Sequence, residues 1–382
     1  MTAPVVRARG EVLLCPGPVM LSAGVRRALA QCEIGHRDAA FSQLVTRLRR
    51  NCATMLGAGP EHSVLLLSGP ATSGIEAVCG TLFPDAGSVV VPVNGTFGQR
   101  IVQILQTLGV PCVPVDFGFG QPFDLARLEA AFATHAGPPI AAVAMTQHET
   151  SCGLVNPVAE VGRLARRHGA RSFVDATSSA GAEDLDVTRD GIDVCVTSSG
   201  KCLHGTPGIA IVCVRREWIE ERSGARAASF SLDLRRYHEQ IEANAQTPFT
   251  PAVPAFLALD RAVEELLEQG GVAERRRQYQ RRRALLLQGL ARLGIEPLRL
   301  PSGAEACSIV TVTVPASIAF EDLYLRMRER GFIIYGAKAP LAPRYFQLAV
   351  MGDLTEADLA GFLREIEAVL SGPASKYRAA TA

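Results

Sequence analysis

The chain has 382 residues, 48% of them hydrophobic and 20% charged, a composition typical of a globular protein with a large core. Its 39 basic and 38 acidic residues nearly cancel, which argues against a nucleic-acid partner. No apolar run approaches the roughly 20 residues of a membrane helix, and residues 1–10 lack the apolar core of a signal peptide. Its ten cysteines form no Cys-x-x-Cys pair, so we expect free thiols, no metal site and a cytoplasmic protein.

Between residues 63 and 214, short apolar runs alternate with amphipathic stretches. This alternation predicts a mostly parallel sheet with helices on both faces. The predicted helices include Phe97–Leu108, Leu125–His135 and Val158–His168. The predicted strands are Ser63–Leu67, Ser88–Val93, Cys112–Asp116, Ile140–Thr146, Arg171–Asp175, Val194–Ser198 and Ile209–Val214.

After residue 255 the pattern changes. Residues 256–293 have a long helical pattern, which predicts one connecting helix. The rest predicts a smaller α+β domain, with strands at Ser308–Val314, Phe332–Tyr335 and Tyr345–Val350 and helices at Phe320–Arg330 and Glu356–Leu370. We therefore expect an N-terminal arm and large domain over 1–255, the connecting helix over 256–293, the small domain over 294–372 and a tail over 373–382.

Lysine is rare in this chain. Only Lys201, Lys338 and Lys376 are lysines among the 39 basic residues. Because arginine stays protonated and cannot do amine chemistry, a lysine in an apolar, Ser/Gly-rich segment marks a place where an amine is required. Lys201 is such a residue, since it follows a predicted strand in the segment Ser198-Ser199-Gly200-Lys201. Lys376 lies in a polar tail and needs no functional explanation.

An acid, Asp175, ends another predicted strand of the same sheet. The carboxyl ends of parallel strands meet at one edge, where ligands bind, so we expect Asp175 and Lys201 to lie near each other. Pyridoxal 5'-phosphate (PLP) requires such a pair, because its aldehyde binds a lysine and its pyridine nitrogen needs an acid to stay protonated. Taken alone, the two residues also suit a helix cap at Asp175 or a structural ion pair.

Two further loops follow predicted strands. Ser68–Glu76 opens a helix, and its small residues and helix N-terminus suit a phosphate, with hydroxyl donors at Thr72 and Ser73. In Val93–Arg100, Phe97 lies among glycines and is free to stack on a flat ring. The alternatives are an ordinary capped loop and a turn with a core phenylalanine. With the lysine and the acid, these loops supply every partner that PLP needs.

A set of motifs spans the chain from Leu14 to about Leu370. They are Cys15–Pro18, Gly35–Arg37, Val93–Arg100, Glu149–Gly153, Asn156–Pro157, Val174–Ser179, Ser198–Gly208, Phe249–Thr250 and Gly331–Tyr335. With them the sequence resembles the class V (fold type I) PLP-dependent aminotransferases, and within that class most of all the transaminases of 2-aminoethylphosphonate and pyruvate. The resemblance implies a large, mostly parallel α/β domain, a smaller C-terminal α+β domain and a homodimer with shared active sites.

The resemblance also implies roles for particular residues. Lys201 is expected to be the Schiff-base lysine that also moves a proton, and Asp175 is expected to pair with the pyridine nitrogen. Phe97 and Thr177 are expected on the two faces of the ring, and Thr150 at the ring hydroxyl. The remaining expected cofactor contacts are Ala71, Thr72 and Ser73 at the phosphate, Ser199, and Thr250 at the phosphate of the neighbouring subunit.

Some positions depart from the pattern of the class. Ala71 stands where a glycine is usual, Gln147 where a histidine is frequent, and Gly200 where relatives have asparagine or glutamine. Most important, Gln347 replaces the arginine that binds the anionic group of the substrate, and a neutral amide binds an anion more weakly.

For the substrate, we expect contacts from Gly17 and Gln347, with Arg37 or Arg344 replacing the lost charge. The expected function is transfer of an amino group between a small amine bearing phosphonate or carboxylate, of the 2-aminoethylphosphonate type, and a keto acid such as pyruvate or glyoxylate. The missing arginine leaves open a PLP-dependent lyase that releases ammonia from an amino-phosphonate without a keto acid. A non-catalytic binding protein on the same fold is the third alternative. No nucleic-acid or membrane partner is expected.

Overall fold

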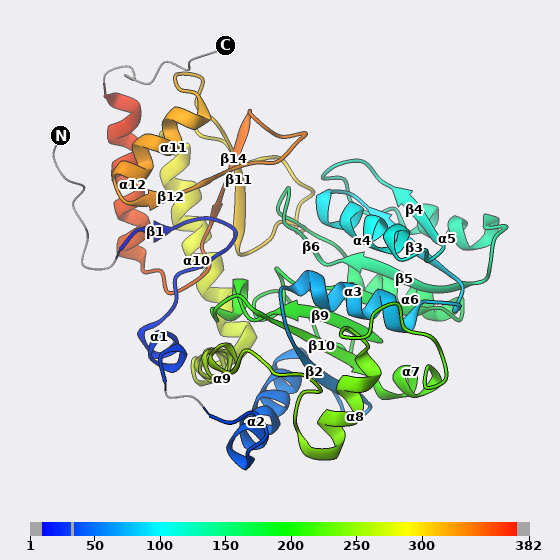
Figure 1. Cartoon of the computed structure of the whole chain (residues 1–382). Helices are drawn as coiled ribbons and strands as arrows, with labels where there is room; N and C mark the ends of the chain where they lie inside the picture. The colour runs from blue at the N-terminus through cyan, green and yellow to red at the C-terminus, as the bar shows by residue number, and fades with distance from the viewer. Residues whose placement is uncertain (1–9, 32–33, 373–382) are drawn as a thin grey trace, which may run out of the picture.

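The computed structural model describes residues 10–31 and 34–372, so the tail expected over 373–382 lies outside the described residues. The chain forms a large α/β domain and a smaller α+β domain (Figure 1). This confirms the predicted fold class. Among the described residues, no helix is long and apolar enough to cross a membrane.

The large domain contains a seven-stranded sheet. Only β10 runs antiparallel to its neighbours, and the other paired strands are parallel. In spatial order the strands are β2 (His62–Ser68), β10 (Ile209–Arg215), β9 (Val194–Ser198), β8 (Arg171–Asp175), β5 (Ile140–Thr146), β3 (Ser88–Val93) and β4 (Cys112–Asp116). All seven match the predicted strands to within one residue. Most of these strands read as continuous apolar runs because both faces of the sheet are covered.

Helices pack on both faces of this sheet, as the strand–helix alternation predicted. One face is covered by α2 (Ala39–Leu56), α5 (Leu125–Thr134), α6 (Val158–Arg167) and α9 (Val253–Glu268). The other is covered by α3 (Ala71–Leu82), α4 (Thr96–Thr107), α7 (Arg216–Glu221) and α8 (Leu234–Asn244). The short helix α1 (Ala23–Leu29) packs against α9 through Val25, Ala258 and Ala262.

The single connecting helix expected over 256–293 is wrong. Helix α9 ends at Glu268, and α10 (Gly271–Arg292) begins after a break. Gly270 and Gly271 have φ angles of 99° and 72°, left-handed values that interrupt a right-handed helix and that glycine adopts without strain. Because α9 packs on the large domain and α10 on the small one, the break lies where the chain passes between the domains.

The small domain is built on a three-stranded antiparallel sheet in the order β11 (Ile309–Thr313), β14 (Tyr345–Ala349) and β13 (Tyr335–Gly336). Helices α10, α11 (Phe320–Glu329) and α12 (Glu356–Ser371) enclose its core. The predicted strand over 332–335 is two short strands, because β12 (Phe332–Ile333) pairs instead with β1 (Val12–Leu13). The start of the described chain therefore packs on the small domain, although the sequence placed it with the large one.

Candidate active site

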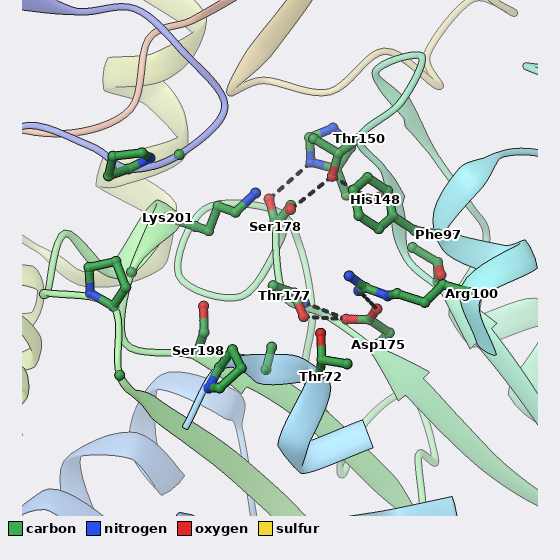
Figure 2. A pocket seen from close by; sticks show the side chains of 18 residues that line it. Thr72, Phe97, Arg100, His148, Thr150, Asp175, Thr177, Ser178, Ser198 and Lys201 are labelled. Atoms are coloured by element: carbon green, nitrogen blue, oxygen red, sulfur yellow. Dashed lines mark hydrogen bonds and ion pairs between the residues drawn. The ribbon is translucent and has the colours of Figure 1, made fainter. Parts of the chain in front are cut away.

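A cavity of about 420 Å³ lies at the carboxyl ends of the parallel strands (Figure 2). This is where open α/β sheets bind ligands. Its lining comes mainly from the loops that the sequence singled out, and from the N-terminal segment. The lining residues are Gly17, Pro18, Pro70, Ala71, Thr72, Phe97, Arg100, Thr146, His148, Thr150, Asp175, Thr177, Ser178, Ser198, Gly200, Lys201, Pro207 and Gly208.

Lys201 begins a short 3-10 helix, η1 (Lys201–Leu203), just after β9. Figure 2 shows its amine directed into the cavity, toward the loop that carries Ser178. Gly17 leaves room for this side chain, because a Cβ atom on Gly17 would lie 3.1 Å from the Cε atom of Lys201. Burial lowers the pKa of Lys201 below its usual 10.5, while the charge of Asp175 opposes that shift. The neutral, nucleophilic form of the amine is therefore more accessible than in an exposed lysine.

Asp175 ends strand β8 and is only 2% exposed. Its Oδ1 atom accepts hydrogen bonds from the Thr177 hydroxyl and from the Thr177 N–H, the latter at 3.0 Å. Its Oδ2 atom accepts a hydrogen bond from Nη2 of Arg100 at 3.3 Å (Figure 2). One carboxylate oxygen thus holds the turn that follows β8, and the other faces a positive charge across the cavity floor.

Arg100 is a site residue to which the sequence reasoning gave no role. It lies near the start of α4, three residues after Phe97, so both side chains lie on one face of the helix. The guanidinium carbon of Arg100 lies 4.7 Å from the centre of the Phe97 ring. The i, i+3 spacing of a cation and an aromatic residue in the predicted helix was the signal available in the sequence.

Glu149 is a second buried acid that went unassigned. Its carboxylate accepts hydrogen bonds from the N–H groups of Phe97 and Gly98, at 3.0 Å each, and so caps the N-terminus of α4. Burial raises the pKa of Glu149. Gly95 lies so close that a Cβ atom on it would come within 2.4 Å of the Glu149 carboxyl carbon. Glu149 thereby fixes the direction in which Phe97 enters the cavity.

Thr150 lines the cavity and donates a hydrogen bond from Oγ1 to Oγ of Ser178 at 2.8 Å. His148 also lines it, and its Nδ1–H donates to the Ser178 carbonyl oxygen at 2.9 Å. Burial lowers the pKa of His148, which favours the neutral ring. Gln147, which stands where relatives often have a histidine, points elsewhere and donates to the Asp184 carbonyl oxygen at 2.9 Å.

The phosphate loop forms the first turn of α3. Ala71 and Thr72 line the cavity there, but Ser73 does not. Ser199 was expected at the cofactor, yet its hydroxyl is buried and donates to the Thr206 carbonyl oxygen at 2.6 Å. It also accepts from the N–H of Ile209 at 3.1 Å. Ser199 therefore braces the loop before β10, and the neighbouring Ser198 lines the cavity instead.

The residues expected at the substrate are dispersed. Gln347 is buried in β14, and its Nε2 donates to the Thr150 carbonyl oxygen at 2.7 Å and to Oγ1 of Thr311 at 3.1 Å. Arg37 donates to the carbonyl oxygens of residues 247 and 248, at 2.8 and 3.2 Å, and lies outside the cavity lining. Arg344 is exposed and also lies outside it. Of this group only Gly17 borders the cavity.

Thr250 is exposed and does not line the cavity of its own chain. Its loop is anchored nearby, because the N–H of Ala252 donates to Oγ of Ser68 at 2.9 Å. The loop therefore lies next to the start of the phosphate loop, on the outside of the subunit. The expected contact of Thr250 with a neighbouring subunit stays a prediction.

Comparison with known proteins identifies the family. The family model for class V aminotransferases matches residues 23–349. A 2-aminoethylphosphonate–pyruvate transaminase from Burkholderia ambifaria (strain MC40-6) is 36% identical over 350 residues, covering 91% of this chain and 92% of that protein. A protein of the same name from Burkholderia pseudomallei (strain 668) is 34% identical over 364 residues, covering 95% and 97%. The chain therefore belongs to the class V aminotransferases, which are PLP-dependent enzymes.

Solved structures agree on the fold. An alanine–glyoxylate aminotransferase from Nostoc sp. superposes with a TM-score of 0.88 at 23% identity, covering 97% of this chain and 98% of that one. A pyridoxamine–pyruvate aminotransferase from Mesorhizobium loti superposes with a TM-score of 0.87 at 20% identity, covering 98% and 95%. Identities this low show a common fold, and the residues of the site have to be judged on their own geometry.

The residues around the cavity fit PLP. Oδ2 of Asp175 faces a guanidinium, which is the kind of charged donor that a protonated ring nitrogen presents. The N-terminus of α3, at Ala71 and Thr72, offers a helix end to the phosphate. Lys201 provides an amine whose pKa is lowered. The set therefore supplies a partner for each polar end of the cofactor.

Proposed function

We propose that this aminotransferase moves the amino group of a small amino-phosphonate, of the 2-aminoethylphosphonate type, to a keto acid such as pyruvate or glyoxylate. The observation that carries the proposal is that Lys201 and Asp175 line one cavity, on a chain whose relatives at 34–36% identity bear that name. A panel of amines, each tested with and without a keto acid, examines the proposal directly.

PLP, when bound, supplies an aldehyde that links to an amine and a ring that draws electrons from the adjacent carbon. We assign Asp175 to the ring nitrogen, the N-terminus of α3 at Ala71 and Thr72 to the phosphate, and Phe97 and Thr177 to the two ring faces. Thr150, held by Ser178, reaches the ring hydroxyl. Lys201 binds the cofactor and then takes and returns the proton that must move between substrate carbon and cofactor carbon.

We further propose a cytoplasmic homodimer in which Thr250 of the partner subunit completes the phosphate site. Two features support it. Phe230 is 67% exposed and packs on Phe249, with ring centres 5.8 Å apart, so an apolar surface lies beside the Thr250 loop. The cysteines within the described residues are free thiols, as suits a reducing compartment. Light scattering on the purified protein, and on a Phe230→Asp variant, tests the dimer.

The decisive assay follows both products. Wild-type protein loaded with PLP should absorb visible light, and after borohydride reduction PLP should remain covalently bound to Lys201. The protein should form alanine only when pyruvate and 2-aminoethylphosphonate are both present. Lys201→Ala should lose the adduct and the turnover, whereas Lys376→Ala should keep both. Ammonia release without a keto acid would instead identify a lyase. A protein that stays colourless after incubation with PLP would contradict the whole assignment.

A further inference from the structure

The geometry points to Lys338 as the cation that binds the anionic group of the substrate, since Gln347 stands where the pattern of the class has an arginine for that purpose. This inference rests on the proposed function, because it concerns the phosphonate end of the same substrate. It replaces Arg37 and Arg344, the two candidates drawn from the sequence.

Gln347 has no donor left for a substrate. A side-chain amide carries two N–H hydrogens, and Nε2 of Gln347 already donates to the Thr150 carbonyl oxygen and to Oγ1 of Thr311. The residue is 6% exposed and carries no charge. It therefore connects the small domain to the Thr150 loop, and the charge needed for an anion has to come from another residue.

The other cations near the site are also in use. Arg37 donates to two backbone carbonyl oxygens outside the cavity. Arg100 pairs with Asp175 on the cavity floor, where the ring nitrogen of the cofactor is expected. Lys201 is proposed to bind the aldehyde of the cofactor. None of these three is therefore available for the distal anion of a substrate.

Lys338 is exposed and, although it is not itself a lining residue, its side chain contacts one that is. It lies on the loop 337–344 between β13 and β14, which extends from the small domain toward α4 (Figure 1). Its ammonium nitrogen is 5.3 Å from the centre of the Phe97 ring, and Phe97 lines the cavity. Among the residues that the structure describes, Lys338 forms no ion pair. An ammonium held over an aromatic face at the cavity edge is poised to accept an anion.

One hairpin carries both Gln347 and Lys338. In the register of β13 and β14, Tyr335 lies opposite Gln347, and Lys338 follows three residues after Tyr335. The hairpin that has glutamine at position 347, where the pattern of the class has arginine, therefore carries a lysine in its loop. The ammonium of a lysine is a compact point charge without the bidentate fork of arginine, so its attraction for an anion grows with the charge of that anion, and a phosphonate carries more negative charge near neutral pH than a carboxylate. We therefore expect this site to favour phosphonate over carboxylate at the distal end of the amine.

The test measures binding of anions that lack the amine, so it does not depend on turnover. Ethylphosphonate and propionate are titrated calorimetrically into PLP-loaded wild type, Lys338→Met, Lys338→Arg and Arg344→Met. Arg344→Met is the matched control, because it removes an exposed positive charge from the same loop. Lys338→Met should weaken ethylphosphonate binding about tenfold, Arg344→Met by less than about threefold, and Lys338→Arg should keep most of the affinity.

Steady-state kinetics give the second readout. In Lys338→Met, KM for the amino-phosphonate should rise about tenfold, with kcat changed by less than about threefold. Unchanged ethylphosphonate binding in Lys338→Met, or an equal loss in Arg344→Met, would overturn the inference. If the wild type fails to transaminate but Lys338→Met still loses ethylphosphonate affinity, then the proposed function fails while the anion site stands.

Discussion

Replacing Gln347 with leucine is expected to cost both stability and activity, although the residue does not line the cavity. Leucine has a similar size but no donor. The change leaves the Thr150 carbonyl oxygen and Oγ1 of Thr311 without the N–H groups that reach them at 2.7 and 3.1 Å. An unsatisfied buried acceptor costs about 1–3 kcal/mol. Because Thr311 keeps its own bond to the Cys152 carbonyl oxygen at 3.0 Å, we expect a total loss of about 2–4 kcal/mol.

The expected shift in melting temperature follows from chain length. An unfolding entropy of about 2.1 cal/mol/K per residue over 382 residues converts this loss into a fall of roughly 2–5 °C. Differential scanning calorimetry measures the shift. Gln106→Leu is the control, since this exposed residue of α4 undergoes the same chemical change at the surface, where the effect is usually within about 0.5 kcal/mol.

Activity should fall together with stability. The Gln347 amide holds the backbone of Thr150, whose hydroxyl is directed to Ser178 inside the cavity. Release of that backbone should loosen the contact that Thr150 is proposed to make with the cofactor, and PLP should dissociate more readily, as measured by the loss of visible absorbance on dilution. A Gln347→Leu protein that melts with Gln106→Leu and retains PLP equally well would show that these bonds contribute nothing.

Three other substitutions or conditions test the remaining groups. Asp175→Asn should retain PLP by absorbance but lose turnover about 100-fold or more, because a neutral amide does not keep the ring nitrogen protonated; near-normal turnover would make Asp175 a cap only. Glu149→Gln should lower the free energy of unfolding by about 1–3 kcal/mol in urea, since one backbone N–H of α4 loses its acceptor. Burial lowers the pKa of Lys201, so the rate of PLP attachment should rise with pH and level off below pH 10.5. A rate that still increases through pH 10.5 would contradict this prediction.

The large sheet was predictable because its strands are buried on both faces. Such strands appear in the sequence as short continuous apolar runs, and glycine, asparagine and serine follow them where the loops begin. The position of the site followed from the same pattern, because the carboxyl ends of parallel strands meet at one edge. The sequence therefore predicted that Lys201, Asp175 and Phe97 lie close together, and the structure places all three at one cavity.

Other features depended on details that an apolar pattern does not encode. The helical pattern runs through Gly270 and Gly271, and only their left-handed φ angles separate α9 from α10. At the end of β9, a single residue decides which hydroxyl faces the cavity, so Ser198 and Ser199 could not be distinguished. The position of Arg37 outside the cavity of its own chain was not foreseen for a third reason, since its carbonyl partners lie about two hundred residues away in the chain.

Gln347, where the pattern of the class has arginine, goes together with a counter-charge for the substrate at a different position, Lys338. A buried arginine must be held by other groups, because an uncompensated charge in a dry site is costly. Glutamine carries no such cost, and its amide joins the small domain to the large one at the Thr150 carbonyl oxygen while a second N–H bonds Thr311 on the neighbouring strand β11. The charge then comes from Lys338, which stays hydrated at the edge of the cavity until an anion arrives. Binding of the substrate anion therefore desolvates one flexible ammonium group and requires no permanently buried ion. For this physical reason, a chain without the arginine still suits an anionic substrate.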